Sequence, residues 1–242
     1  MFFEDEEFSE KKNESTEMSN LNIDNDIWTI NNGVLEEYKD FDSETVRVPE
    51  GVTLIQPYVF AFNESLKSIY IPKSVQRLES DAIVENLELI KIYIENENIE
   101  IIEGAIAENV SLEEVYIGGQ KVDYIIAKTE DKGELSFEKY LGEAKEFVIP
   151  DGVKMINSYA FEFCDSLETL YLPESVTDLS HNSFAHCNNI KEFKVPPYVE
   201  FMGAELFIGW SEEQTIYVPH TFKKMKFLQR WRRGCKAQII YY

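Results

Sequence analysis

The strongest constraint on this chain is a repeat of 23 residues. The residues that begin successive repeats at this spacing, or within one residue of it, are Val52, Val75, Ile99, Val122 and then Val153, Val176, Val199 and Phe222. After each start, an aliphatic residue stands three positions on, an Ala-Phe-like pair at seven and eight, and Asn or Cys at eleven. Three apolar residues and a proline complete the pattern. A fixed period of this length is typical of a solenoid, in which each repeat, here called a rung, contacts only its neighbours.

Prolines mark where the strands of the rungs end. Six of the eight stand three residues before a rung start, namely Pro49, Pro72, Pro150, Pro173, Pro196 and Pro219. Proline has no N–H to donate to a ladder, so it is expected at strand ends. The stretches before these prolines alternate apolar and polar residues, as in Ile69-Tyr70-Ile71. They predict short strands that stack at about 4.8 Å into a parallel sheet, with one continuous apolar column inside.

Position eleven holds a small side chain that can bond to backbone groups. Its occupants are Asn63, Asn86 and Asn109 in the first half, and Cys164 and Cys187 in the second. We expect a buried structural ladder that satisfies the amides of the turns. The alternative is a redox or metal pair formed by Cys164 and Cys187. We expect no metal and no cofactor.

The 23-residue pattern lapses between about residues 122 and 150. The segment from Gly133 to Val153 echoes the one from Gly33 to Val52, so the chain reads as two copies of one unit, each with a short lead followed by rungs. The apolar pieces around Gly133 allow the lead to be a β-hairpin. We expect one continuous solenoid, with room for a slight bend at this insertion.

The full pattern, V-x-x-I-x-x-x-A-F-x-x-C-x-x-L-x-x-L-x-L-P, resembles the BspA-like leucine-rich repeats of bacteria and protozoa. Residues 153–175 match it at every position, and the resemblance covers about residues 32–242. Two departures weaken it: the rung from Ile99 is one residue short before Asn109, and Glu213 replaces an apolar residue. The resemblance implies a repeat solenoid with a parallel β-sheet on one face, short turns or helical segments on the other, and a β-hairpin-like insertion. It also implies surface adhesion or host-protein binding, which is the role of many members.

The net charge of −22 is unevenly distributed over 242 residues. Residues 1–26 carry nine acidic residues and two lysines and are expected to be a disordered tail. The solenoid, residues 27–221, holds 36 acidic against 14 basic residues, which argues against nucleic acid or an anionic membrane as the partner of the body. Residues 222–242 carry seven basic residues and no acidic one.

The basic C-terminal segment is expected to cap the last rung with a helix and a strand. Met225, Leu228 and Trp231 form one apolar helical face, Gly234 ends the helix, and residues 237–242 form a closing strand. The alternative is a binding site for anionic lipid, nucleic acid or an acidic partner, including the acidic tail of another copy.

No stretch of the sequence is apolar over the roughly 20 residues that cross a bilayer. The N-terminus has no signal peptide as written, so we expect a cytoplasmic protein, or a cell-surface protein if a leader is missing. Cys164, Cys187 and Cys235 are too few for a disulfide framework and are expected to be reduced thiols.

One outward-facing position of the strands carries mostly tyrosine. In successive matching strands it is occupied by Tyr70, Tyr93, Tyr116, Tyr171, Lys194 and Tyr217. Stacked rings on a parallel sheet stabilise one another by about 0.2–1 kcal/mol per pair. The same rings also form a rigid amphipathic surface for a protein or glycan partner. The sequence leaves both roles open for these candidate binding residues.

Motifs of known catalytic chemistry are absent from the sequence. His181, His186 and His220 lack the spacing of metal ligands, and His181 and His186 are expected on a surface turn. A thiol nucleophile at Cys187 beside His186 conflicts with the buried ladder. We therefore expect a non-catalytic protein-protein interaction module that binds a macromolecular partner on its sheet face. A cytoplasmic scaffold or adaptor and a purely structural spacer are the alternatives.

Overall fold

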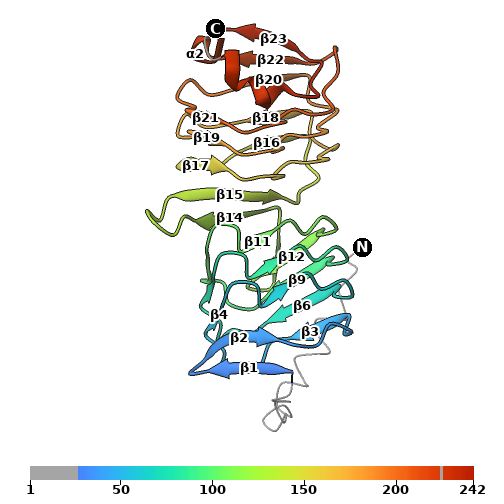
Figure 1. The fold of residues 1–242 in the computed structure, drawn as a ribbon, viewed down its shortest axis with the longest axis vertical. Helices are drawn as coiled ribbons and strands as arrows, with labels where there is room; N and C mark the ends of the chain where they lie inside the picture. Colours follow the sequence, from blue (N-terminus) through green and yellow to red (C-terminus); the bar gives the residue numbers. More distant parts are fainter. Residues whose placement is uncertain (1–26, 224–225) are drawn as a thin grey trace, which may run out of the picture.

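The computed structural model describes residues 27–223 and 226–242, and within them the side chains of residues 226–228 are left out. The rungs are stacked along the long axis of a rod, with the C-terminus at one end (Figure 1). The predicted tail over residues 1–26 lies outside the described residues. The predicted fold class, a repeat solenoid of stacked parallel strands, is confirmed.

The N-terminal unit, residues 28–122, begins with an antiparallel hairpin and continues in three parallel stacks. The hairpin consists of β1 (Trp28–Asn31) and β2 (Val34–Tyr38). Strand β2 begins the first stack, which continues through β4 (Leu54–Ile55), β7 (Arg77–Leu78) and β10 (Glu100–Ile101). The second stack contains β3 (Thr45–Arg47), β6 (Ser68–Ile71), β9 (Lys91–Ile94) and β12 (Glu114–Ile117), and β13 (Gln120–Val122) closes it in antiparallel pairing. The third contains β5 (Phe60–Ala61), β8 (Ile83–Val84) and β11 (Ile106–Ala107).

The C-terminal unit, residues 124–241, repeats this plan with fewer strands. Its hairpin consists of β14 (Tyr124–Lys128) and β15 (Leu135–Tyr140), and β15 pairs in parallel with β17 (Val153–Ile156), followed by β19 (Asp178–Leu179) and β21 (Phe201–Met202). The other side carries β16 (Glu146–Val148), β18 (Thr169–Tyr171), β20 (Glu192–Lys194), β22 (Thr215–Val218) and β23 (Gln238–Tyr241). Between β22 and β23 lie a short helix α2 (His220–Lys223) and a 3₁₀ helix η3 (Lys226–Arg232).

The strand register corrects one rung boundary. Arg77 pairs with Glu100 and Leu78 with Ile101, so the residue equivalent to Val75 is Asn98 and not Ile99. The 23-residue spacing is therefore kept through this rung, and Asn109 stands at position eleven as in the other rungs. The apparent loss of one residue came from aligning on apolar character, because Asn98 has replaced the usual valine.

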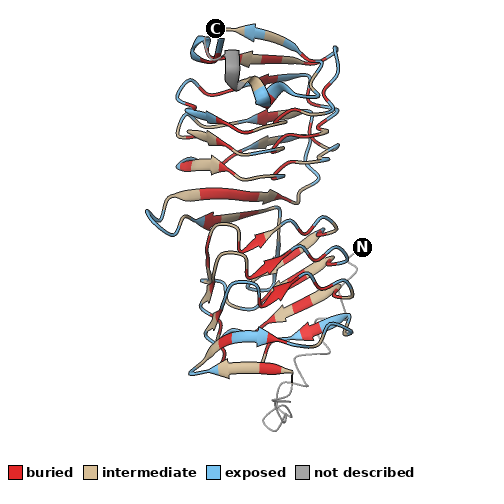
Figure 2. Ribbon diagram, viewed as in Figure 1, coloured by how far each residue is buried: buried red, intermediate tan, exposed pale blue. Residues whose placement is uncertain are grey.

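The expected single apolar column is wrong in one respect, because the buried residues form two separate clusters. Ile125 and Ala127 of β14 belong to the first cluster, whereas Phe137 and Tyr140 of β15 belong to the second. The hairpin β14–β15 thus separates the two cores. An isolated parallel bridge between Ile102 and Lys128 still joins the units. The strands of the two units are inclined to one another at this point, and each unit has its own buried interior (Figures 1 and 2).

Candidate binding surfaces

The first three tyrosines of the outward stripe form a closed stack on the second sheet of the N-terminal unit. The ring centroids of Tyr70 and Tyr93 are 4.5 Å apart, and those of Tyr93 and Tyr116 are 4.8 Å apart, with both pairs nearly parallel. This spacing equals the distance between neighbouring strands, so the parallel register imposes it. The Arg47 guanidinium lies 3.9 Å from the Tyr70 ring centroid and covers the end of the stack. Burial raises the pKa of Tyr93.

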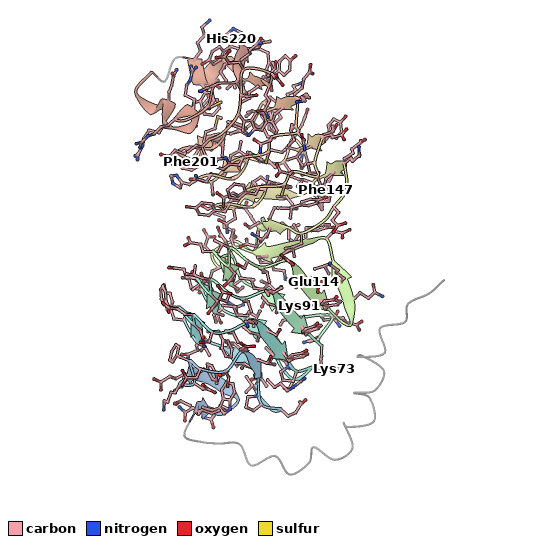
Figure 3. All side chains as sticks on the ribbon, turned by 90° about the vertical axis from the view of Figure 1, so that its right-hand side faces the viewer. Lys73, Lys91, Glu114, Phe147, Phe201 and His220 are labelled. Atoms are coloured by element: carbon pink, nitrogen blue, oxygen red, sulfur yellow. The ribbon has the colours of Figure 1, made fainter. Side chains whose placement is uncertain are left out.

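Ion pairs surround this stack. Lys91 and Glu114, on the neighbouring strands β9 and β12, approach to 2.8 Å, and Lys121 lies 3.1 Å from the same carboxylate (Figure 3). Hydrogen bonds to the charged carboxylate lower the pKa of Glu114, with the larger effect from Lys91 and a smaller one from Lys121. The three tyrosine rings thus contact one another and side chains of their own sheet. This arrangement supports the stabilising role for Tyr70, Tyr93 and Tyr116.

The second half of the stripe is open. Tyr171 is 52% exposed, and among the described residues no ring stacks on Tyr171 or Tyr217. Lys194 pairs with Tyr217 across strands β20 and β22, and this lysine interrupts the run of rings. Its ammonium lies 5.0 Å from the centroid of the Tyr242 ring, whose hydroxyl donates to the Val195 carbonyl at 2.6 Å.

These residues line a groove of about 690 Å³, which we call the C-terminal groove. Tyr171, Lys194, Tyr217 and Tyr242 contribute its outward side chains, and strands β18, β20 and β22 form its floor. Sequence reasoning missed Tyr242, because no period connects the last residue of the chain to the stripe. The structure therefore divides the predicted stripe into two surfaces, since the antiparallel strand β13 closes the first sheet beyond Tyr116.

The asparagines at position eleven are buried and connect successive rungs. The Oδ1 atom of Asn86 accepts the backbone N–H of Asn63 at 3.0 Å, and the Oδ1 atom of Asn109 accepts that of Asn86 at 3.0 Å. The Nδ2 atoms of Asn86 and Asn109 donate to carbonyls of the same preceding rung, at 2.9 and 2.8 Å. Each amide thus spans the step between two rungs with both its acceptor and its donor.

The ladder of the C-terminal unit keeps the donor and loses the acceptor. The thiol of Cys187 donates to the Phe161 carbonyl at 3.0 Å, and the indole N–H of Trp210 donates to the Phe184 carbonyl at 2.8 Å. Each carbonyl lies 26 residues before its donor, as in the asparagine ladder. Trp210 was missed as a ladder member, although its spacing of 23 residues from Cys187 was available in the sequence.

This exchange changes the local backbone. With asparagine at position eleven, residues eight and nine form the third stack of strands, β5, β8 and β11. With Cys164 or Trp210 there, the backbone N–H bonds within its own rung, to Phe161 and Phe207 respectively, and the segment is a turn. A thiol or indole offers no strong acceptor for a neighbouring N–H, so this N–H bonds to a carbonyl three residues earlier in its own rung and the backbone forms a turn.

Cys187 is buried, and Cys164 and Cys235 are half-buried. All three are free, and burial raises the pKa of Cys164 to about 12 and raises that of Cys187. Among the described residues, no group of three or more His, Cys, Asp and Glu side chains is arranged to hold a metal ion. His181 accepts the Ala204 N–H through Nδ1 at 2.8 Å, and His186 stacks on Phe163.

The C-terminal segment covers the last rung and continues its ladders. Strand β23 pairs in parallel with β22, the Trp231 side chain is buried, and Lys236 N–H donates to the Trp210 carbonyl at 2.8 Å. The predicted cap of a helix and a strand is present, with the helical part formed by α2 and the 3₁₀ helix η3. Met225 and the side chain of Leu228 lie outside the described residues. The basic side chains described as exposed are Lys223, Arg230, Arg232, Arg233 and Lys236.

Stacked 23-residue rungs with a buried polar ladder define a β-solenoid of the leucine-rich repeat class. The model of the BspA type leucine rich repeat region matches residues 6–129 and 133–228 in six copies. The chain belongs to this family. Repeats of this class are typically protein-interaction modules without enzymatic activity. Among the described residues, no helix is long and apolar enough to cross a membrane.

The solved structures to which the chain is similar are distant from it in sequence. A leucine rich cell surface protein from Faecalibacterium prausnitzii is 22% identical, with a TM-score of 0.51, over 82% of this chain and 59% of that one. A leucine-rich repeat protein from Eubacterium ventriosum is 15% identical, with a TM-score of 0.37, over 76% of this chain and 64% of that one. The chain thus spans less than two thirds of either structure. No curated protein matches the chain.

Proposed function

We propose that the chain binds a protein partner on its sheet face, with the C-terminal groove as the principal contact. The observation that carries this proposal is the contrast between the two halves of the tyrosine stripe. Tyr70, Tyr93 and Tyr116 are stacked on one another, whereas Tyr171 and Tyr217 present their rings to a groove of about 690 Å³.

The groove has the chemistry of a protein-binding surface. Tyrosine offers a large contact area with only two side-chain torsions to order, and its hydroxyl supplies a directional hydrogen bond. The neighbouring apolar side chains of Val148 and Ile240 are also exposed on this sheet. Lys194 places a cation between the rings, which favours a partner segment that combines apolar and acidic side chains.

We further propose that the partner is bound at a cell surface, as adhesion or host-protein binding, and that the chain does not catalyse a reaction. The surface role is supported by the printed name of the protein from Faecalibacterium prausnitzii, a cell surface protein. A cytoplasmic scaffold is the competing role. Accessibility of the protein to an added protease on intact cells supports the surface role, and full protection until lysis contradicts it.

The sheet-face proposal is tested by two matched double substitutions in the full chain. Tyr171→Ser with Tyr217→Ser removes the open rings, and Tyr93→Ser with Tyr116→Ser removes stacked rings from the N-terminal unit. Each purified variant is immobilised, and proteins captured from cell extracts are quantified by mass spectrometry. We expect the first variant to lose the specific partner and the second to retain it while unfolding at a lower urea concentration. Equal capture by the Tyr171/Tyr217 variant and the wild type would refute the proposal.

A further inference from the structure

A cleft opens where the two units meet. Its volume is about 960 Å³, and it is lined on one side by the last rungs of the N-terminal unit and on the other by the hairpin and first rung of the C-terminal unit. We call it the junction cleft. It exists because the two cores are separate and the strands of the units are inclined to one another (Figure 1). None of the tyrosines of the outward stripe lines the junction cleft, and Tyr171 and Tyr217 line the C-terminal groove instead.

Both walls of the junction cleft carry exposed apolar side chains. Leu87 and Val110 of the N-terminal unit are 54% and 68% exposed, and Phe163 of the C-terminal unit is 61% exposed. Phe163 and Tyr159 also have left-handed backbones, with φ of 59° and 61°, a conformation that is unfavourable for bulky residues. The same left-handed positions recur in the first rung at Tyr58 and Phe62, so this conformation is a feature of the rung, and Phe163 also stacks on His186.

The cleft is strongly acidic. Its lining contains eight carboxylate side chains and only two lysines, Lys121 and Lys139. Lys121 is already paired with Glu114. The potential inside a concave surface of one charge sign is focused, so it attracts cations more strongly than the same charges on a flat surface.

Glu138 lies at the base of this cleft, where its carboxylate contacts both units. It is only 5% exposed, and its Oε2 atom accepts from the Gly104 N–H and from the Asn157 amide, both at 2.9 Å. Those two donors come from different units, so the carboxylate bridges the junction. Its Oε1 atom is fully buried, and the buried hydroxyl of Ser136 on the same strand acts to lower the pKa of this carboxyl against the effect of burial.

We propose that the junction cleft binds a short segment of a protein partner in which lysine or arginine residues alternate with apolar residues. Its ammonium or guanidinium groups pair with exposed carboxylates of the lining such as Glu85 and Glu108, and its apolar residues pack against Leu87, Val110 and Phe163. The occupant is basic because the cleft is acidic, and it contains apolar residues because both walls are apolar. This second site is independent of the C-terminal groove.

Ionisation of Glu138 is coupled to this binding. Burial raises the pKa of Glu138, and it also raises the pKa of Glu103, to which Glu138 adds a repulsive contribution. A cation bound in the cleft favours the charged form of this carboxylate. Lys139, adjacent in sequence, has its pKa lowered by burial, so it competes weakly with an incoming ammonium.

The test uses two fluorescein-labelled peptides, Leu-Lys-Leu-Lys-Leu and its uncharged counterpart Leu-Gln-Leu-Gln-Leu, titrated with the full chain and followed by fluorescence anisotropy. We expect the lysine peptide to bind about tenfold more tightly or better. Glu138→Gln retains an acceptor for Gly104 and Asn157 and removes the charge, so it should weaken binding of the lysine peptide at least about fivefold. Phe163→Ser should do the same by removing the apolar wall.

Two controls separate a specific site from general attraction. Glu174→Gln removes an exposed acid that does not line the cleft, and Tyr171→Ser with Tyr217→Ser alters the C-terminal groove. Both should leave the affinity within about twofold of the wild type. Equal binding of the two peptides would overturn the proposal. An effect of Glu138→Gln no larger than that of Glu174→Gln, or loss of binding in the tyrosine variant, would overturn it as well. The first two of these results leave the sheet-face proposal untouched.

Discussion

Truncation of Asn86 to alanine tests whether the polar ladder holds the rungs together. The Asn86 side chain accepts the Asn63 N–H at 3.0 Å and donates to the Phe60 carbonyl at 2.9 Å and to Asn109 Oδ1 at 3.1 Å. It is fully buried, so water does not replace these partners. Asn86→Ala removes these hydrogen bonds and a fourth, from Nδ2 to the Val84 carbonyl at 3.1 Å, and leaves the N–H of Asn63 without its acceptor.

The expected loss of stability follows from these contacts. Each hydrogen bond contributes about 0.5–1.5 kcal/mol, and a buried N–H left without a partner costs about 1–3 kcal/mol. Together they predict that Asn86→Ala lowers the free energy of unfolding by at least about 3 kcal/mol. This is a large part of the roughly 5–15 kcal/mol that stabilises a typical domain. Urea unfolding followed by circular dichroism measures the difference.

Asn86→Cys provides a matched intermediate, because Cys187 occupies the same position in the C-terminal unit and still donates to the carbonyl of the preceding rung. The thiol restores the donor and not the acceptor, so we expect roughly half of the alanine effect. Glu88→Gln changes an exposed residue nearby and should stay within about 0.5 kcal/mol of the wild type. A loss below about 1 kcal/mol for Asn86→Ala, or equal losses for the alanine and cysteine variants, would refute the ladder's role.

Three further predictions concern other parts of the fold. Burial raises the pKa of Glu138 above its unfolded value, so the folded state holds the proton more tightly and stability falls as pH rises between the two pKa values. Glu138→Gln should flatten this fall in urea midpoints measured between pH 5 and about pH 8, and an unchanged pH profile would contradict the assignment. Iodoacetamide should label Cys164 and Cys187 slowly in the native protein and rapidly in denaturant, because burial raises both thiol pKa values; rapid native labelling, read by mass spectrometry, would contradict burial. A Cβ at Gly203 would lie 2.6 Å from the backbone nitrogen of His181, so Gly203→Ala should lower the free energy of unfolding by about 1–3 kcal/mol, and an unchanged urea midpoint would show that the rungs can separate there.

Local repetition made much of this structure predictable. The 23-residue period identified the solenoid, its inward residues and its family, because each rung presents the same side chains to identical neighbours. Asn63, Asn86 and Asn109 could be assigned to one buried ladder from spacing and chemistry alone. The period failed only where an unusual residue occupied a repeated position, as at Asn98, and the hydrogen-bond register was needed to correct it.

The division of the tyrosine stripe could not be read from the period. Tyr116 and Tyr171 occupy equivalent positions in the sequence, but β13 closes the first sheet in between. Whether two equivalent rings stack depends on whether their strands pair. Lys194, which keeps Tyr171 and Tyr217 from forming a continuous run, was visible in the sequence, whereas the groove completed by Tyr242 was not.

The sequence by itself determined the repeat, the faces of the strands and the positions of the ladder, since these follow from side-chain pattern over one rung. Only the tertiary structure decided how the two units meet. Strand β14 contributes buried residues to the core of the N-terminal unit, and strand β15 contributes to that of the C-terminal unit. Glu138 joins the units by accepting hydrogen bonds from Gly104 and Asn157. The junction cleft results from contacts between residues that no period relates, so its acidic, apolar-walled shape became visible only when both units were placed side by side.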